Sequence, residues 1–554
     1  MTVVPGGGAR LRPRSRRPHT FRRARILLGA LVAATIVSLA VGAVRANRAS
    51  AEQMPPPTGP SSTTPTPTAT TPTPTTAPAI TPVGPSVPAT VTVSTTGRMV
   101  PVPASFLGFS TEYWALPIDV LYSTLFQRVL ADVTVPGQAL VLRIGGDSAD
   151  QTFWEPSVSA YPFWAYGLTP AWMQQTAALI VADHLHVILD VNHISGTPQQ
   201  AAALVSEAEQ TFPASSITGI EIGNEPDAYT QPSWQAFVGS STVGPFGEAD
   251  LPAAITPTNY RATFAAYASA VAPVAPNVPL MGPALAVPQQ GSSWITALTQ
   301  PPQPGLGAIT MHEYPFGDCG DPTGPVYPSV AGLLNRHAVL NVFSSLRLDA
   351  LQAQWARLPL RVTEFNSVTC GGVAGVSDSF ATALWAPGAL FEMLSAGVAS
   401  ADLHLRTTPI NAPFVYQDGG VSVRPLLYGL ILFQRMLGRD ARLADTTVAA
   451  GAKLGLSGWA VQVGRDRLNV LLLDKDPRGA RVRLDVPAGA DATVQTLAAP
   501  SANASSDVTL DGQQLDAQAE WEGTPLTRTI TGSGGVFHLR VRGISATLVT
   551  ISGA

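Results

Sequence analysis

The chain has 554 residues, of which 45% are hydrophobic and only 13% are charged, and it contains 50 prolines and 49 glycines. This length supports a sizeable buried core in more than one domain, with long loops and linkers between them. The formal net charge of -4 argues against nucleic acid as a partner.

The N-terminal segment predicts a membrane anchor. Arginines crowd residues 1–25, and residues 26–44, "ILLGALVAATIVSLAVGAV", then run without a charge over a length that roughly matches the hydrocarbon core of a bilayer. The positive-inside rule keeps the basic tail in the cytoplasm. We therefore expect a single-pass signal anchor in the cell membrane with the rest of the chain outside the cell. A cleaved export signal, which would give a secreted protein, is the alternative, because small residues follow in "RANRASA".

A linker separates this segment from the folded part. Residues 45–88 alternate Thr and Pro, as in "TTPTPTATTPTPTTAP", and have almost no apolar bulk, which predicts a disordered, extended linker. The strand-like segment 89–104 follows. We expect it to pair with a C-terminal β-sandwich, and a strand that caps the next domain is the alternative.

Residues 105–437 alternate short apolar runs with helical stretches, which is typical of parallel β/α units. Eight such units predict an α/β fold, a (β/α)8 TIM barrel. The short alternating runs of residues 438–554 predict a β-sandwich domain. The eight predicted barrel strands begin at Phe106, Ala139, His186, Gly219, Val278, Ala308, Leu360 and Ala401.

Polar residues concentrate where a barrel of this kind carries its chemistry. Seven of the eight predicted strands end in polar side chains, which argues for one polar site at the C-terminal end of the barrel. These residues are Glu112, Asp147 with Asp150, Asn192 with His193, Asn224 with Glu225, His312 with Tyr314, Glu364 with Asn366, and Arg406.

Two carboxylates at the ends of strands four and seven are what glycosidic bond cleavage needs. One must be a protonated acid that faces the leaving oxygen, and the other an ionised nucleophile or base. Glu225 and Glu364 fit these roles. Asn224 can hydrogen-bond a sugar 2-hydroxyl, and Tyr314, on the strand between them, can donate to the nucleophilic carboxylate.

The motifs "FLGFSTEYW", "LRIGGDSAD", "EIGNEPD" and "TEFNSVTCGG" resemble, in their order, those of glycoside hydrolase clan A and, more narrowly, family 79, which holds heparanase and β-glucuronidases. The resemblance covers roughly residues 91–554. It implies a barrel with a terminal sandwich and a carbohydrate substrate. It also implies an acid/base Glu225, a nucleophile Glu364 with Tyr314 beside it, and sugar-hydroxyl contacts from Asn224, Asp150 and Glu112.

The residues that would bind the sugar carboxylate differ from those of that family. In its glucuronidases a tyrosine shortly after the nucleophile and a glycine N–H hold the sugar carboxylate, whereas here Thr369 stands where the tyrosine aligns and Gly371 remains. Phe414 and Tyr416 both suit a further tyrosine position, and spacing does not choose between them. Tyr416 supplies a donor, and Arg406 a possible counter-charge. We expect a preference for a β-glucuronide or related uronide, with a neutral arabinoside or xyloside as the alternative, or a surface glycan-binding protein without turnover.

The two cysteines, Cys319 and Cys370, each lie a few residues past the end of a predicted strand, the sixth and the seventh. Neighbouring strands bring such loops together, and disulfides persist outside the cytoplasm, so we expect a Cys319–Cys370 bridge. Two free buried thiols are the alternative. The sequence has no zinc-binding spacing, so we expect neither a metal nor a cofactor.

Overall fold

The computed structural model describes residues 85–553, apart from residues 98, 104, 158–160, 162–163, 230–254, 318–325, 407–408 and 451–454. The predicted basic tail, the membrane anchor and nearly all of the predicted linker lie outside the described residues and stay predictions. Within the described part of the chain, no helix combines the length and the apolar character that a bilayer crossing requires.

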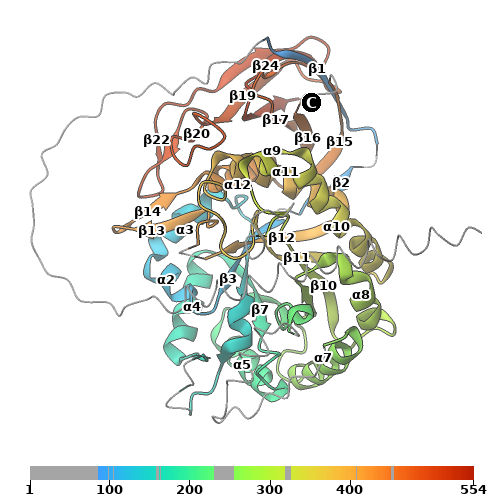
Figure 1. Cartoon of the computed structure of the whole chain (residues 1–554), viewed down its shortest axis with the longest axis vertical. Coiled ribbons are helices and arrows are strands. Elements are labelled where there is room, and N and C mark those ends of the chain that lie inside the picture. Colours follow the sequence, from blue (N-terminus) through green and yellow to red (C-terminus); the bar gives the residue numbers. More distant parts are fainter. Residues whose placement is uncertain are drawn as a thin grey trace, which may run out of the picture.

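Eight parallel strands close into a barrel, which confirms the predicted TIM barrel (Figure 1). Each strand pairs in parallel with its neighbours, and the last strand pairs with the first through Ala401 and Leu107. Around the barrel the strands are β3 (Leu107–Glu112), β4 (Leu140–Gly145), β7 (Leu185–Val191), β8 (Ile217–Ile222), β9 (Leu280–Leu285), β10 (Leu306–Glu313), β11 (Leu360–Phe365) and β12 (Val398–Leu405).

Helices surround the barrel, and three of them begin with the same dipeptide. In each of these, a threonine side chain accepts a hydrogen bond from a backbone N–H of the first turn, and a proline occupies the first helical position. The Thr-Pro pairs at Thr169, Thr197 and Thr256 therefore fix where α4, α5 and α7 begin. The helices are α2 (Leu116–Leu121), α3 (Ser123–Asp132), α4 (Pro170–Ala182), α5 (Pro198–Thr211), α7 (Pro257–Val271), α8 (Gly291–Thr299), α9 (Val330–Leu334), α10 (Arg336–Trp355), α11 (Phe380–Ala396) and α12 (Pro425–Met436).

The C-terminal region forms one sheet that folds over itself, at the upper end of the molecule in Figure 1. Apolar side chains of β1, β18 and β24 share a core with those of β16, β17, β19 and β25, so the two arms of the sheet pack face to face. The predicted second domain is therefore built from a single continuous sheet. Its main strands are β1 (Val87–Ser94), β15 (Ala441–Ala450), β16 (Leu456–Val463), β17 (Arg467–Asp474), β18 (Ala480–Asp485), β19 (Asp491–Ala498), β24 (Val536–Val541) and β25 (Ser545–Ser552).

The N-terminal segment that we expected to join this domain contributes β1. This strand pairs antiparallel with β15 and parallel with β18. A short strand β2 (Val100–Pro101) also pairs with β15. In sequence, the whole barrel is therefore inserted between β2 and β15.

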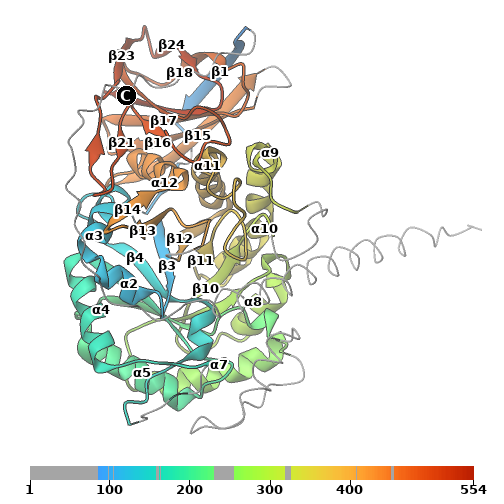
Figure 2. The same cartoon turned by 60° about the vertical axis from the view of Figure 1, so that its left-hand side comes forward.

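Two barrel helices, α11 and α12, lie between the barrel and the sheet (Figure 2). Phe391 of α11 stacks on Trp459 of β16 with ring centroids 5.5 Å apart, and Asn469 of β17 donates to the carbonyl of Met436 in α12 at 2.9 Å. The sheet thus buttresses the side of the barrel that carries β11 and β12.

Candidate active site

The chain leaves β8 through strained backbone. Gly223 and Glu225 have φ angles of 77° and 50°, in the left-handed region that costs a residue with a side chain about 1–3 kcal/mol. The N–H of Glu225 donates to the carbonyl of Ala284 at 3.0 Å, which ties the exit of β8 to the exit of β9. Asp227 then accepts two backbone N–H bonds from the loop after β9. These contacts fix the direction in which the Glu225 side chain leaves the barrel wall.

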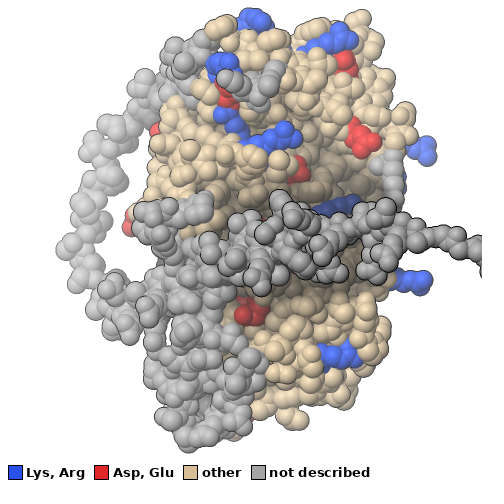
Figure 3. Space-filling model, turned by 45° about the vertical axis from the view of Figure 1, so that its right-hand side comes forward, with Lys and Arg blue, Asp and Glu red and all other residues tan. Residues whose placement is uncertain are grey.

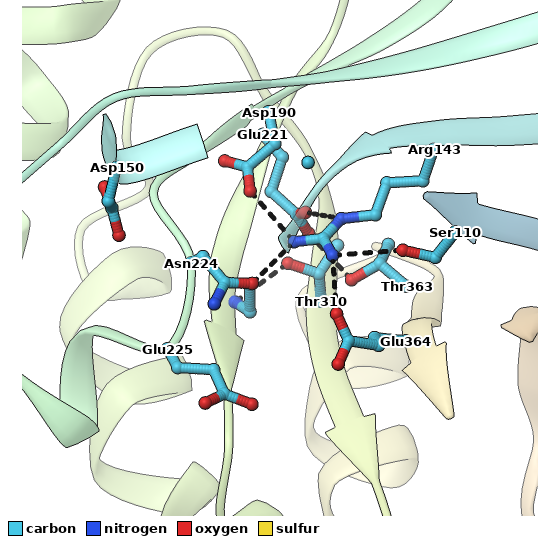
Figure 4. A network of polar contacts seen from close by, with 12 residues as sticks. Ser110, Arg143, Asp150, Asp190, Glu221, Asn224, Glu225, Thr310, Thr363 and Glu364 are labelled. Atoms are coloured by element: carbon cyan, nitrogen blue, oxygen red, sulfur yellow. Dashed lines mark hydrogen bonds and ion pairs between the residues drawn. The ribbon is translucent and has the colours of Figure 1, made fainter. Parts of the chain in front are cut away.

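A buried arginine on β4 organises the carboxylates around it (Figure 4). Although burial lowers the pKa of Arg143, the charges of the neighbouring carboxylates outweigh it and raise the pKa, so the guanidinium stays charged. Sequence patterns do not indicate this residue, because it lies inside an apolar strand. Arg143 donates to Glu221 (2.7 Å), Asp190 (2.9 Å), Asn224 (3.0 Å), Glu364 (3.0 Å) and Ser110 (3.2 Å).

Glu364 leaves β11 into this network. Its Oε2 accepts from Arg143, and its Oε1 accepts from the hydroxyl of Tyr314 at 2.7 Å and lies 2.8 Å from Nδ1 of His404. Burial alone raises the pKa of this carboxyl, but the charges of His404, His312 and Arg143 outweigh it and hold the pKa well below its usual range. Glu364 is therefore an ionised carboxylate in the free protein.

His404, on β12, links two carboxylates. Its Nδ1 faces Glu364, and its Nε2 lies 3.6 Å from Oε1 of Glu112. Burial lowers its pKa, but these two carboxylates raise it to about 9, so the ring is an imidazolium at neutral pH. Sequence reasoning missed His404, although it lies two residues before Arg406 and therefore on the same face of its strand.

Glu225 and Glu364 point into the same space. The side chain of Glu225 is 24% exposed, and its Oε1 lies 2.9 Å from Nδ1 of His312. One oxygen of each glutamate and a ring nitrogen of His312 all lie within 4.8 Å of one another. These three donors are close enough to hold a metal ion, but Glu225 and His312 are hydrogen-bonded to each other, and Glu364 is already paired with two cations and a phenol. All three potential metal ligands therefore already have hydrogen-bond or ion-pair partners within the protein.

The sugar-binding candidates divide into two groups. Asn224 and Tyr314 lie beside the glutamates, as described. Glu112 is only 1% exposed; its Oε2 accepts from the N–H of Ser148 at 2.8 Å, and its Oε1 faces His404. Burial raises its pKa, but His404 and Arg406 outweigh this effect and lower it. Glu112 therefore lies behind His404. It contacts the imidazolium and is not exposed to the open part of the site.

Asp150 is also placed away from the network in Figure 4. It is fully buried. Its Oδ1 accepts from the N–H groups of His193 and Ile194, at 2.9 and 3.2 Å, and its Oδ2 accepts from the hydroxyl of Tyr229. A sugar hydroxyl has no free oxygen to reach on this carboxylate, so the structure assigns Asp150 to holding the loop after β7 rather than to the predicted sugar contact.

Asp147 occupies the position that we expected for Asp150. It is half-buried, and its Oδ1 accepts from the side-chain amide of Asn224 at 3.3 Å. Burial, together with the charges of Glu112 and Glu225, raises its pKa to about 7. Asp147 is therefore the carboxyl group of this turn that lies beside Asn224.

The residues predicted to bind a uronate lie on the segments that follow β11 and β12 in the chain. Thr369 and Gly371 are half-buried in the loop after β11, where Gly371 has a φ of 84°. Tyr416, on β13 (Phe414–Gln417), donates to Oδ1 of Asp119 at 3.0 Å and stacks on Tyr122. Its hydroxyl hydrogen is thus used within the protein. Phe414, the other candidate, is fully buried.

Arg406 follows the last residue of β12, with its guanidinium over the ring of Trp114 at 5.6 Å from the centroid. Its charge lowers the pKa of both Glu112 and Asp147, so it acts electrostatically on these two carboxyl groups. Cys319 lies outside the described residues. No free cysteine is found among the described residues, and the Cys319–Cys370 bridge stays a prediction.

Comparisons with known proteins establish the fold. No model of a protein family matches the sequence, and no curated protein matches it. Among solved structures, a 4-O-α-L-rhamnosyl-β-D-glucuronidase from Fusarium oxysporum is similar at 18% identity and a TM-score of 0.66, over 83% of this chain and 100% of that one. An α-L-arabinofuranosidase from Thermotoga maritima follows at 15% and 0.59, over 84% and 100%. A family 44 xyloglucanase from Paenibacillus polymyxa is similar at 11% and 0.56, over the same shares.

Proposed function

We propose that this protein is a retaining glycoside hydrolase, similar to family 79, that cleaves β-linked uronides by double displacement. The observation that carries the proposal is the approach of Glu225 and Glu364, whose nearest carboxylate oxygens lie within 4.8 Å. Retaining enzymes place their two carboxyl groups about 5–5.5 Å apart, whereas inverting enzymes leave about 6.5–9.5 Å for a water molecule. The short gap supports direct attack by one glutamate.

In the first step, the ionised Oε of Glu364 forms a bond to the anomeric carbon while the glycosidic bond breaks. Glu225 gives its proton to the leaving oxygen. In the second step, Glu225 takes a proton from water, which displaces Glu364 and restores both groups. Arg143, Tyr314 and His404 hold Glu364 in place and ionised. The amide of Asn224 has a second hydrogen beyond the one given to Asp147, and it can donate that hydrogen to the sugar 2-hydroxyl.

The uronide preference is supported by the cation that acts on Glu112 and Asp147. A sugar carboxylate needs donors, and a buried charge without them is strongly disfavoured. Arg406 offers a charged guanidinium, while the N–H of Gly371 and the hydroxyl of Thr369 offer neutral donors. The likeness in fold to a rhamnosyl-glucuronidase agrees with this choice.

A neutral-sugar glycosidase is the second candidate. The arabinofuranosidase fold is similar over the same part of the chain. The hydroxyl of Tyr416 donates its hydrogen bond to Asp119, so this predicted uronate donor is already used within the protein. A surface glycan-binding protein without turnover is less well supported, because Glu225 and Glu364 lie close together with their partners in place.

Two measurements test the proposal. A panel of aryl glycosides, with β-glucuronide, β-glucoside, β-xyloside and α-arabinofuranoside, ranks the sugars by kcat/KM, and the β-glucuronide is expected to be the fastest. An activated 2-fluoro analogue of the best substrate should trap a covalent adduct on Glu364, visible as a mass increase in one peptide. An adduct elsewhere, inversion of the product anomer or faster arabinoside turnover would overturn the corresponding part of the proposal.

The location of the protein and its disulfide are proposals of the same kind. We expect the full chain to fractionate with membranes and to be cleaved by protease added to intact cells. Recovery in the culture medium would indicate that the export signal is cleaved. For the Cys319–Cys370 bridge, iodoacetamide should label neither thiol in the unfolded, unreduced protein and both after reduction.

A further inference from the structure

The outer surface of the C-terminal sheet carries a hollow of about 800 Å³. It lies over β1, β15, β18 and β24 of the C-terminal sheet, outside the barrel. On β1 and β15, small side chains such as Thr90 and Ala449 leave room. The long side chains of β18 and β24 stand along one side, because both strands alternate buried and exposed positions. Small residues beside long ones thus shape an elongated trough.

The long side chains are all basic. Arg481 and Arg483 are the exposed positions of β18, and His538 and Arg540 are those of β24. We call these four residues the basic face. Figure 3 shows several Lys and Arg side chains on the upper end of the molecule, where this sheet lies, although the net charge of the chain is -4.

The pairing of the two strands places basic residues opposite each other, and in one pair both residues are arginines. Arg481 lies directly opposite Arg540, and Arg483 lies directly opposite His538. Arg483 shares its charge with Asp485 in an ion pair of 2.9 Å, but in the described part of the chain neither Arg481 nor Arg540 takes part in an ion pair. Like charges directly opposite each other destabilise a sheet. An anionic ligand would offset this repulsion.

The spacing of the basic face suits a linear anion. Residues two apart on a strand lie about 6.6 Å from each other, and neighbouring strands are about 4.8 Å apart. Three arginines and a histidine therefore form a small grid beside the trough, which matches charges that repeat along a chain. A bilayer surface is flat and does not fill a trough. The described lining includes no Phe, Tyr or Trp on which a nucleic acid base could stack.

We propose that the basic face and its trough bind an acidic polysaccharide, a polymer of uronic acid units, at a site separate from the barrel. The choice of a polysaccharide rests on the proposed function, since an enzyme that cleaves uronides meets such chains. The face would keep a polymer close while the barrel site cleaves it, and it would contribute little to the turnover of a small aryl glycoside.

The test compares two double variants of the full chain with equal loss of charge. R481S/R540S removes the two arginines for which the described residues provide no ion-pair partner, whereas the control R465S/R528S removes two exposed arginines elsewhere in the C-terminal region. Both are made on an inactive Glu225→Gln background, so that binding is measured without cleavage. Immobilised hyaluronate and polygalacturonate are the probes, and dextran is the neutral control.

R481S/R540S is expected to bind the acidic polymers at least about tenfold more weakly, because charge-assisted contacts are lost, while the control pair binds as the parent does. Its melting temperature should equal or exceed that of the parent, because the opposed charges are gone. Equal binding by both variants, an equal loss in both, or tighter binding to anionic lipid vesicles than to the polymers would overturn the proposal. Failure of every aryl glycoside in the active protein, with polymer binding intact, would instead overturn the proposed function alone.

Discussion

Replacing His404 by glutamine tests whether a buried imidazolium sets the ionisation of Glu364. The two groups approach to 2.8 Å. At an effective dielectric constant of about 20, Coulomb's law gives roughly 6 kcal/mol at this distance, and burial of both groups offsets much of it. Charge-assisted hydrogen bonds contribute about 1.5–3 kcal/mol net, and about 1.4 kcal/mol corresponds to one pKa unit. The substitution should therefore raise the pKa of Glu364 by about one to two units.

The assay is the pH dependence of kcat/KM on the best aryl glycoside. Activity requires ionised Glu364, so the acidic limb of the profile follows the pKa of this group in the free enzyme. In His404→Gln this limb should move to higher pH by about one to two units. The wild-type enzyme should also lose activity as the pH rises through about 9, where His404 loses its proton, and the variant should lack that step.

Tyr314→Phe is the matched control for this experiment. The phenol donates to the same oxygen of Glu364 but carries no charge. Its loss should reduce kcat/KM and move the acidic limb in the same direction but by less than in His404→Gln, because only the acceptor of this hydrogen bond is charged. An acidic limb that stays in place in His404→Gln would refute the electrostatic role of His404.

Three further predictions concern the surroundings of the site. Arg143→Met should lower the free energy of unfolding in urea by about 3–5 kcal/mol, because it leaves buried carboxylates without their cation. A loss below about 1 kcal/mol would contradict this. Burial raises the pKa of Glu313 to about 8, so the folded state binds its proton more tightly than the unfolded state, and stability falls as the pH rises from about 4.5 to 8. Glu313→Gln should therefore flatten the decline in melting temperature between pH 5 and pH 8, and an unchanged slope would argue against it. Gly146→Ala would place a Cβ 2.7 Å from Oε1 of Glu112, whereas Gly375→Ala has a similar positive φ and no atom within 4 Å. Backbone strain should lower kcat/KM to a similar extent in both variants, and only Gly146→Ala should lower it further through the contact with Glu112. Equal effects of the two substitutions would argue against a role for that contact.

The barrel could be predicted because its signals are local. Short apolar runs, Thr-Pro helix starts and polar strand ends each arise within a few residues, and parallel strands bring those ends together. Glu225, Glu364, Asn224 and Tyr314 were found in this way, and the structure brings all four to one place.

The rest of the site depends on contacts across the barrel. Arg143 and His404 lie within strands, and only closure of the barrel brings them to Glu364. The stretch "GGDSAD" could be recognised as polar, but not which carboxylate faces the site. It folds as a 3-10 helix, η1 (Gly146–Gln151), in which Asp147 is half-buried beside Asn224 and Asp150 is fully buried. The two aspartates are only three residues apart in this short helix, and the sequence pattern does not show which of them lies beside Asn224.

The insertion of the barrel between β2 and β15 has a consequence for synthesis of the protein. β1 leaves the ribosome first, but its antiparallel partner β15 begins only at Ala441. At about 5–20 residues per second, the wait is roughly 20 to 70 s. During that time the Val- and Thr-rich β1 is an unpaired strand beside a barrel that is still forming, and such a strand can pair with other chains. We therefore expect β1 to stay open to such pairing until β15 has been made, after about four-fifths of the chain.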